Sequence, residues 1–285
     1  MCCTGVILSG GKGKRLSSYF PTKQFLKYKG TPLIVKAIRN LPQTCSEIIV
    51  TVHDQEQRKK TQELLNNYLE DITTIRIVLD EVYFLGNIGP LNGFLSGLKY
   101  ATNNKLIIKP VDTPNLIPSH YQALLELIEE ENDTASFIDK SGYVSTLNVA
   151  VKEREKRLKK LIFIIKKKQQ YGLKIRASDI FLAGKNIALL RVVEQAIHVL
   201  KNINTPNDLE SNNNLTVRKI NVFKDEVFKI TNNPEYASIF KYLDAGNINW
   251  EKIDSVIRPW VGTHIYGQLS KDFKELLKQN QTFYL

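Results

Sequence analysis

In the first half of the chain, short apolar runs alternate with longer segments in which apolar residues recur every three or four positions. The apolar runs are rich in Ile, Val and Leu, and they lie at 5–9, 47–52, 75–80 and 105–112. Continuous apolar runs of this length are typical of strands that are buried on both faces. The pattern therefore predicts a sheet of mostly parallel strands in the interior of the protein.

Helical periodicity fills the segments between these runs. The stripes of residues 34–41 and 91–98 follow the spacing i, i+3, i+4 and i+7, which is typical of a helix with one buried face. Asp54 is placed to cap a helix that extends to Leu69. Because strands and helices alternate, right-handed crossovers place helices on both faces of the sheet, and the expected fold class is α/β.

The second half of the chain is less regular. The pattern predicts two further strands and then two helices, at 134–139, 143–151, 152–168 and 187–200. A polar break, "SNNN", follows at 211–214 and predicts a domain boundary. We therefore expect a first domain at 1–215 and a C-terminal extension of unknown role at 216–285, which holds both tryptophans, Trp250 and Trp260.

Composition places the chain among globular proteins of the cytoplasm. Its 285 residues are 42% hydrophobic, which suffices for a sizeable core. No apolar run approaches the ~20 residues of a membrane span, and the first residues lack the pattern of a secretory signal, so we expect no membrane association. Cys2, Cys3 and Cys45 have no metal-binding spacing, which favours a reduced protein.

The net charge of +11 raises the question of a nucleic-acid partner. Residues 152–168 contain nine Lys or Arg and only two Glu, so most of the excess lies in one predicted helix. A run of charge is more often a solvated helix face than a recognition surface, and this interpretation is favoured here. A nucleic-acid or membrane surface is the disfavoured alternative, and the oligomeric state stays open.

The stretch "LSGGKGKRL" (8–16) follows the first predicted strand. Gly10, Gly11 and Gly13 allow close approach of the backbone, and their N–H groups can hold phosphate oxygens at the carboxyl edge of a parallel sheet. Arg15 and Lys23 would add positive charge for a triphosphate. The spacing matches neither the ATPase P-loop nor the dinucleotide fingerprint, so a sharp turn without a ligand is the simpler alternative.

Two carboxylates and a helix start are predicted at the same edge. Asp80 closes the third strand, and Asp112, in "PVDTPNL", closes the fourth. A carboxylate opposite a phosphate site suits a Mg²⁺ ion that bridges nucleotide phosphates, whereas an Asp in such a turn can also serve only as a cap. Gly89 and Pro90 begin a predicted helix, which suits either a ligand or simple capping.

Taken together and in order, these segments resemble a known family. They are "LSGGKGKRL", Lys23, "VLDE", "GPLNGFLSGL", "VDTPNL" and "NINTPNDL". Over roughly residues 4–210 the chain is similar to the nucleotidyltransferases typified by the molybdenum cofactor guanylyltransferase. The resemblance implies a Rossmann-like three-layer α/β/α sandwich with a mostly parallel sheet. It also implies Mg²⁺-dependent transfer of a nucleoside monophosphate from a nucleoside triphosphate to a phosphorylated acceptor, with release of pyrophosphate.

The resemblance also implies roles for individual residues. Arg15, Lys23 and Asp112 would be catalytic, and Asp112 would hold the metal. The acceptor would meet Asn202 and Asn204 in "NINTP", unless these form only a polar turn. The nucleotide would be bound by the glycine-rich loop and by residues along the same edge, which are Leu8, Ser9, Gly10, Gly11, Gly13, Lys23, His53, Asp80, Gly89, Pro90 and Asp112. His53 stands where the family often has Asn, and a surface role at a strand end is its alternative.

The base and the acceptor stay open between branches of this family. "DTP" and "GPLNG" favour the molybdenum-type branch, with GTP and molybdopterin. "TKQFLKYKGTPLI" is close to the isoprenoid-pathway cytidylyltransferases, and the linker between Arg15 and Lys23 is longer than the usual molybdenum-type linker. A cytidylyltransferase or a sugar-phosphate nucleotidyltransferase is therefore the alternative. A nucleotide-sensing or nucleic-acid-binding protein on an inactive scaffold is the non-enzymatic alternative, against which Arg15, Lys23 and Asp112 argue.

Overall fold

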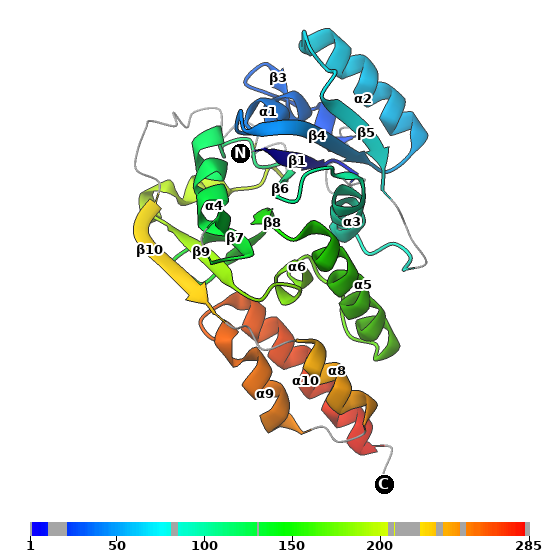
Figure 1. Cartoon of the computed structure of the whole chain (residues 1–285), viewed down its shortest axis with the longest axis vertical. Helices are drawn as coiled ribbons and strands as arrows, with labels where there is room; N and C mark the ends of the chain where they lie inside the picture. Colours follow the sequence, from blue (N-terminus) through cyan, green and yellow to red (C-terminus); the bar gives the residue numbers. More distant parts are fainter. Residues whose placement is uncertain are drawn as a thin grey trace.

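The computed structural model describes residues 2–10, 22–80, 85–129, 131–204, 208, 223–231, 236–245 and 249–282. An eight-stranded sheet in the order β10-β9-β7-β8-β6-β1-β4-β5 forms the centre of the molecule (Figure 1). Its strands are β1 Cys3–Leu8, β4 Cys45–Val52, β5 Ile75–Leu79, β6 Leu106–Pro110, β7 Thr134–Ile138, β8 Val144–Val151, β9 Ile187–Val192 and β10 Phe223–Ile230. Within this sheet β8 and β10 run against the other strands, so the predicted mostly parallel α/β architecture is confirmed.

Helices cover both faces of this sheet. The α-helices are α1 Leu33–Arg39, α2 Gln55–Tyr68, α3 Pro90–Tyr100, α4 Pro118–Glu129, α5 Arg154–Gln170, α6 Asp179–Leu182, α8 Ala237–Asp244, α9 Trp250–Ile257 and α10 His264–Thr282. Short 3₁₀ segments η1 Lys23–Phe25, η2 Glu194–Leu200 and η3 Arg258–Trp260 and a small hairpin of β2 Lys27–Tyr28 with β3 Thr31–Pro32 complete the described elements. The Asp54 carboxylate accepts a hydrogen bond from the Gln57 N–H at 2.8 Å, as its predicted capping role requires.

The central strands bury side chains on both of their faces. In β1, Val6 and Leu8 pack toward α3 and α5, whereas Ile7 between them packs toward α1 and α4. This alternation explains why the strand reads as one continuous apolar run. Each fully buried aliphatic side chain of this kind stabilises the fold by about 1.5–3 kcal/mol relative to an exposed one.

The prediction of one helix at 187–200 is wrong. Residues 187–192 form β9, which pairs in parallel with β7 and antiparallel with β10, and only the following residues form the short helix η2. Ile187 and Leu189 are buried on one face of the sheet, and Ala188 and Leu190 on the other. A strand that is buried on both faces has the same apolar content as a buried helix, so the pattern alone did not distinguish them.

The C-terminal extension contributes to the same sheet and the same core. Strand β10 is the edge strand beside β9, and α8, α9 and α10 lie beside α5 and α6 (Figure 1). Trp260 is 1% exposed and contacts Phe181 of α6, with 5.8 Å between the ring centroids. The boundary predicted at residue 215 lies outside the described residues.

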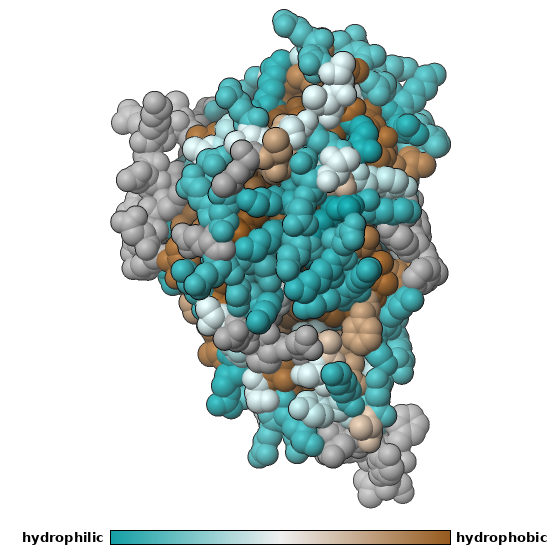
Figure 2. Space-filling view, viewed as in Figure 1, coloured by the Kyte–Doolittle hydropathy of each residue, from teal (hydrophilic) through white to brown (hydrophobic). Residues whose placement is uncertain are grey.

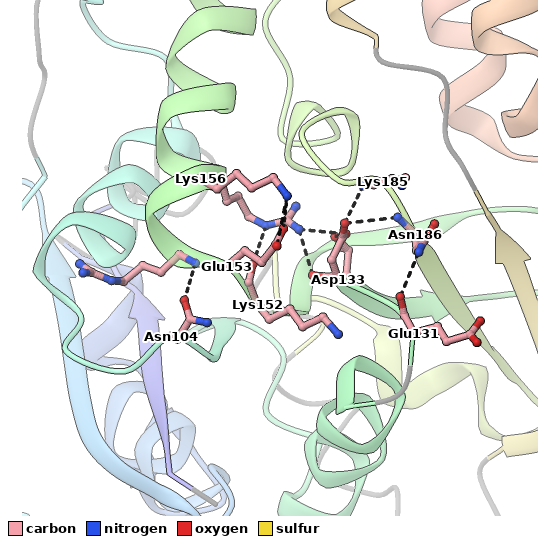
Figure 3. Close-up of polar contacts among 11 residues, drawn as sticks. Asn104, Glu131, Asp133, Lys152, Glu153, Lys156, Lys185 and Asn186 are labelled. Atoms are coloured by element: carbon pink, nitrogen blue, oxygen red, sulfur yellow. Dashed lines mark hydrogen bonds and ion pairs between the residues drawn. The ribbon is translucent and has the colours of Figure 1, made fainter.

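Part of the positive charge of α5 is internal. Arg157 is buried and forms an ion pair of 3.0 Å with Asp133, which also accepts hydrogen bonds from the backbone N–H groups of Lys185 and Asn186 (Figure 3). Lys168 is likewise buried against the Asp179 carboxylate, at 2.5 Å. These two cations therefore link α5 to Asp133, which precedes β7, and to Asp179 of α6.

Hydrophilic side chains cover most of the face that Figure 2 presents. Among the helices that the structure describes, none combines the length and the apolar content that crossing a membrane requires.

Candidate active site

Three side chains from distant parts of the chain meet at the carboxyl edge of the sheet. Lys23 begins η1, Asp112 lies in the turn after β6, and Asn204 follows η2. The Lys23 ammonium lies 2.6 Å from Asp112 Oδ2 and donates a hydrogen bond of 3.1 Å to Asn204 Oδ1. The structure therefore brings together a cation, a carboxylate and an amide that the sequence assigned to phosphate, metal and acceptor.

The second carboxylate oxygen of Asp112 is buried and makes no hydrogen bond with the described residues. A buried polar atom without a partner is costly, and a carboxylate oxygen is the ligand that Mg²⁺ prefers. Among the described residues, no group of three or more His, Cys, Asp or Glu side chains is arranged to hold a metal. Asp112 therefore fits a Mg²⁺ ion, for which it would supply a carboxylate ligand.

The turn that carries Asp112 rests on a buried lysine. Lys109 of β6 is 0% exposed, and its ammonium donates hydrogen bonds to the carbonyl oxygens of Thr113 and Leu116 and to the Tyr121 hydroxyl. Burial lowers the pKa of Lys109 to about 7. No carboxylate accepts from it in these contacts, so its role is to hold the backbone of the turn.

Two buried glutamines join the end of β1 to η1. Gln57 Nε2 donates to the Ser9 carbonyl oxygen at 3.0 Å and to Gln24 Oε1 at 2.8 Å, and its Oε1 accepts from the His53 N–H. Gln24 is the residue after Lys23, so this link fixes the start of the glycine-rich segment relative to Lys23. The sequence pattern marks neither glutamine as a site residue, because their polar partners lie far along the chain.

Asp80 lies at the end of β5 between two glycines. A Cβ atom placed on Gly10 would lie 1.9 Å from Asp80 Oδ2, and one placed on Gly93 would lie 3.1 Å from Asp80 Oδ1. The carboxylate can therefore pack here because both residues lack a side chain. Burial raises the pKa of Asp80 to about 6, although the neighbouring Thr51 hydroxyl acts in the opposite direction.

The other predicted nucleotide-site residues line the same edge or lie outside the description. Leu8 and Ser9 are buried at the end of β1, and Gly89, with φ +68°, and Pro90 begin α3, which carries Gly93. Gly11, Gly13 and Arg15 lie outside the described residues. His53 is partly exposed at the end of β4, where its backbone contacts Gln57.

The two predicted acceptor residues flank a buried anchor. Ile203 is 0% exposed, and its N–H donates to the Asp112 carbonyl oxygen at 2.9 Å. Asn202 and Asn204 on either side of it are partly exposed. The segment "NIN" is therefore tied to the turn that carries Asp112.

The fold and this edge define the class of protein: a mostly parallel α/β sandwich in which a lysine, a carboxylate and an amide meet where β1 and β6 end. The chain belongs to the family of MobA-like NTP transferase domains, whose family model matches residues 5–177.

Relatives in two branches of nucleotidyltransferases are similar to it. A probable molybdenum cofactor guanylyltransferase of Bacillus mycoides (strain KBAB4) is 27% identical over 131 residues, which are 46% of this chain and 59% of that protein. A 2-C-methyl-D-erythritol 4-phosphate cytidylyltransferase of Thermosipho africanus (strain TCF52B) is 27% identical over 187 residues, which are 62% of this chain and 76% of that protein. The chain thus spans less than two thirds of the length of the guanylyltransferase that it matches.

Solved structures support the fold. The bifunctional IspDF from Campylobacter jejuni has a TM-score of 0.54 at 15% identity, covering 74% of this chain and 54% of that one. The 4-diphosphocytidyl-2C-methyl-D-erythritol synthase from Anaerococcus prevotii DSM 20548 has a TM-score of 0.50 at 15% identity, covering 74% and 94%. The Rossmann-like α/β fold implied by the sequence resemblance is thereby confirmed.

Proposed function

We propose that the protein is a Mg²⁺-dependent nucleotidyltransferase that moves a nucleoside monophosphate from a nucleoside triphosphate to a phosphorylated acceptor. The observation that carries this proposal is the meeting of Lys23, Asp112 and Asn204 at one sheet edge, with one Asp112 oxygen buried and not hydrogen-bonded by any described residue. It combines a phosphate-binding cation with a carboxylate suited to a hard metal ion.

The residues of the chain act through charge and position. An acceptor phosphate oxygen forms a bond to the α-phosphorus, while the bond from that phosphorus to the bridging oxygen breaks and its electron pair leaves with pyrophosphate. The acceptor phosphate is anionic at neutral pH, so no general base is required. Lys23, with Arg15 from the glycine-rich loop, would offset the repulsion between the two polyanions and align them. Mg²⁺ held by Asp112 would supply further neutralisation of phosphate charge.

GTP is the favoured donor. A carboxylate has two acceptor oxygens, and guanine presents adjacent N1–H and N2–H donors that can pair with both. Asp80 is buried beside the start of the glycine-rich segment, and within the described part of the chain its Oδ1 has no hydrogen bond of normal geometry. CTP is the second candidate, because the cytidylyltransferase of Thermosipho africanus aligns over a larger share of this chain and the "KQFL" segment contains Lys23.

Molybdopterin is the favoured acceptor, because probable molybdenum cofactor guanylyltransferases are among the relatives of this chain. Asn204 contacts Lys23 and so stands where the acceptor phosphate would approach. A sugar phosphate on the same site is the alternative acceptor.

A thermal-shift screen of the four nucleoside triphosphates, each with and without Mg²⁺, tests the donor and the metal together. A ligand at 100 times its Kd stabilises the folded state by about 2.7 kcal/mol. We expect the largest shift for GTP with Mg²⁺, and loss of the Mg²⁺-dependent part in Asp112→Asn. Asp71→Asn, which changes an exposed carboxylate outside the site, is the matched control. An Asp112→Asn protein that kept the full Mg²⁺-dependent shift would refute the metal assignment.

A further inference from the structure

An exposed aromatic ring stands at the same sheet edge as Asp112. Tyr143 is 47% exposed and immediately precedes β8. In the sheet, β8 lies between β6 and β7. Tyr143 at the start of β8 and Asp112 after the end of β6 therefore belong to neighbouring antiparallel strands at one edge.

Register and contacts place the two segments at a similar height. Val149 of β8 pairs with Ile108 of β6, and from this level both chains extend past the end of the ladder toward Asp112 and Tyr143. The Thr113 hydroxyl, next to Asp112, donates to Asn148 Oδ1 of β8 at 3.0 Å. Burial and, second, the Asp112 carboxylate raise the pKa of Tyr143, so the two groups are within electrostatic reach.

The C-terminal extension supports this ring from one side. The His264 ring at the start of α10 stacks on Tyr143, with 4.8 Å between centroids and 23° between planes. His264 Nδ1 accepts from the Val144 N–H at 3.1 Å, and the His264 N–H donates to the Gly142 carbonyl oxygen at 3.0 Å. A Cβ on Gly142 would lie 2.1 Å from the Gly262 carbonyl oxygen, so the turn and the extension fit closely.

We propose that the exposed face of Tyr143, backed by His264, binds the flat ring of the proposed pterin acceptor. The inference rests on the proposed nucleotidyltransferase function and adds the residues of this chain that would hold that ring. The acceptor phosphate would lie toward Lys23 and Asn204, and its ring would lie over Tyr143. The C-terminal extension thereby becomes part of the acceptor site.

The stacked His264 ring pre-organises Tyr143 for binding. An aromatic ring that is held on one face offers a rigid surface on the other, and flat heteroaromatic groups bind such surfaces without a precise hydrogen-bond pattern. On the described part of the extension, Val261 is 51% exposed and precedes Gly262, which meets the Gly142 turn, so it is a second exposed apolar side chain near Tyr143. Two such side chains are too few for a stable protein interface, which buries about 800 Å² on each partner.

Direct binding to the full chain tests this proposal without turnover. The probes are a pterin monophosphate, which has a flat ring, and glycerol 3-phosphate, which has a phosphate and no ring. We expect the full chain to bind the pterin monophosphate at least tenfold more tightly than glycerol 3-phosphate. Tyr143→Leu should lower the affinity for the pterin monophosphate about tenfold and leave the affinity for glycerol 3-phosphate unchanged. Tyr143→Phe keeps the ring and should bind within about twofold of the unmodified protein. His264→Ala should weaken the binding of the pterin monophosphate only, and His264→Phe should restore that binding.

Tyr242→Leu is the matched control, because Tyr242 is an exposed tyrosine on α8 and is not at this edge. Equal affinity for the two probes, or an unchanged ratio in Tyr143→Leu, would overturn the proposal. So would a change of equal size for both probes in the His264 variants, which would indicate a merely structural role. Failure to release pyrophosphate from any nucleoside triphosphate would instead refute the proposed function, while the two binding constants would still measure the ring surface.

Discussion

Asp80 is a carboxylate whose ionised form is destabilised by burial at the candidate site. Its carboxylate is packed against Gly10 and Gly93, and burial raises its pKa to about 6. The unfolded chain releases this proton near pH 4. The folded state therefore holds this proton more tightly, and the contribution of Asp80 to the free energy of unfolding is highest below pH 4 and falls as the pH rises through 6.

Asp80→Asn should remove this pH dependence. The variant carries no charge to bury, so at pH 7 it should be more stable than the unmodified protein, by on the order of 3 kcal/mol. Urea unfolding at half-unit steps from pH 4 to pH 7 measures the effect. A variant whose stability fell over this range as steeply as that of the unmodified protein would contradict the assignment.

Nucleotide binding should depend on the same proton. Donors on a base favour the ionised carboxylate, so protonation of Asp80 below about pH 6 should weaken the binding of GTP. Titration calorimetry of GTP at pH 5, 6 and 7 should give a Kd that increases as the pH falls. Asp80→Asn should bind weakly at all three values; a Kd of the unmodified protein that did not change with pH would refute the contact.

Lys23→Ala should reduce kcat/KM. Removing a pre-organised charge from developing phosphate charge costs roughly 2–4 kcal/mol of transition-state stabilisation. Steady-state pyrophosphate release measures this change, and Lys27→Ala, which changes an exposed lysine of β2, is the control. An unchanged kcat/KM would exclude Lys23 from the reaction.

At the scale of elements, the buried parallel strands were predictable and β9 was not. The runs that became β1, β4, β5 and β6 are bounded by turns and followed by helical stripes, so their length and context identify them. Residues 187–200 join the strand β9 and the short helix η2 without a turn signal between Val192 and Glu194. A single apolar segment therefore contained two elements.

The site likewise contains residues that local patterns identify and residues that they do not. Lys23, Asp112 and Asn204 could be predicted as candidates because each lies in a motif at a strand end or loop. Lys109 lies within an apolar run and contacts the turn only in the folded chain, and Gln24 and Gln57 meet across 33 residues. Their contacts depend on the fold, which local patterns do not describe.

Lys109→Met tests the support of the turn after β6. The substitution leaves the carbonyl oxygens of Thr113 and Leu116 without this donor, and an unsatisfied buried acceptor costs about 1–3 kcal/mol. Chemical denaturation should show this loss. Lys105→Met is the matched control, because Lys105 forms a partly exposed ion pair with Glu129 and should change stability by less than about 1 kcal/mol. Equal effects of the two substitutions would contradict a special role of Lys109.

At the scale of the molecule, one core joins the sheet to the C-terminal extension. Apolar side chains of α5 and α6 are buried together with those of α8, α9 and α10. The match to the family model ends at residue 177, so much of this core is built from residues that follow it. The extension therefore stabilises the whole fold and also supports Tyr143.

Unfolding should consequently be a single transition. Both tryptophans lie in the extension, so fluorescence reports on it, whereas far-UV circular dichroism reports mainly on the remaining helices and strands. We expect the two signals to change at the same urea concentration, with Trp260→Phe shifting both midpoints together. Separate midpoints would show that the extension folds independently.

The position of β10 at one edge of the sheet has a consequence for synthesis on the ribosome. Strand β9 and the apolar side of α5 leave the exit tunnel before the segments that cover them. At the usual speed of translation, about 5–20 residues per second, the segment from β10 to the end of α10 follows over roughly 3–12 s. During that interval the nascent chain exposes the unpaired edge of β9 and the apolar side of α5. Exposed apolar surface of this kind is what a ribosome-associated chaperone would bind.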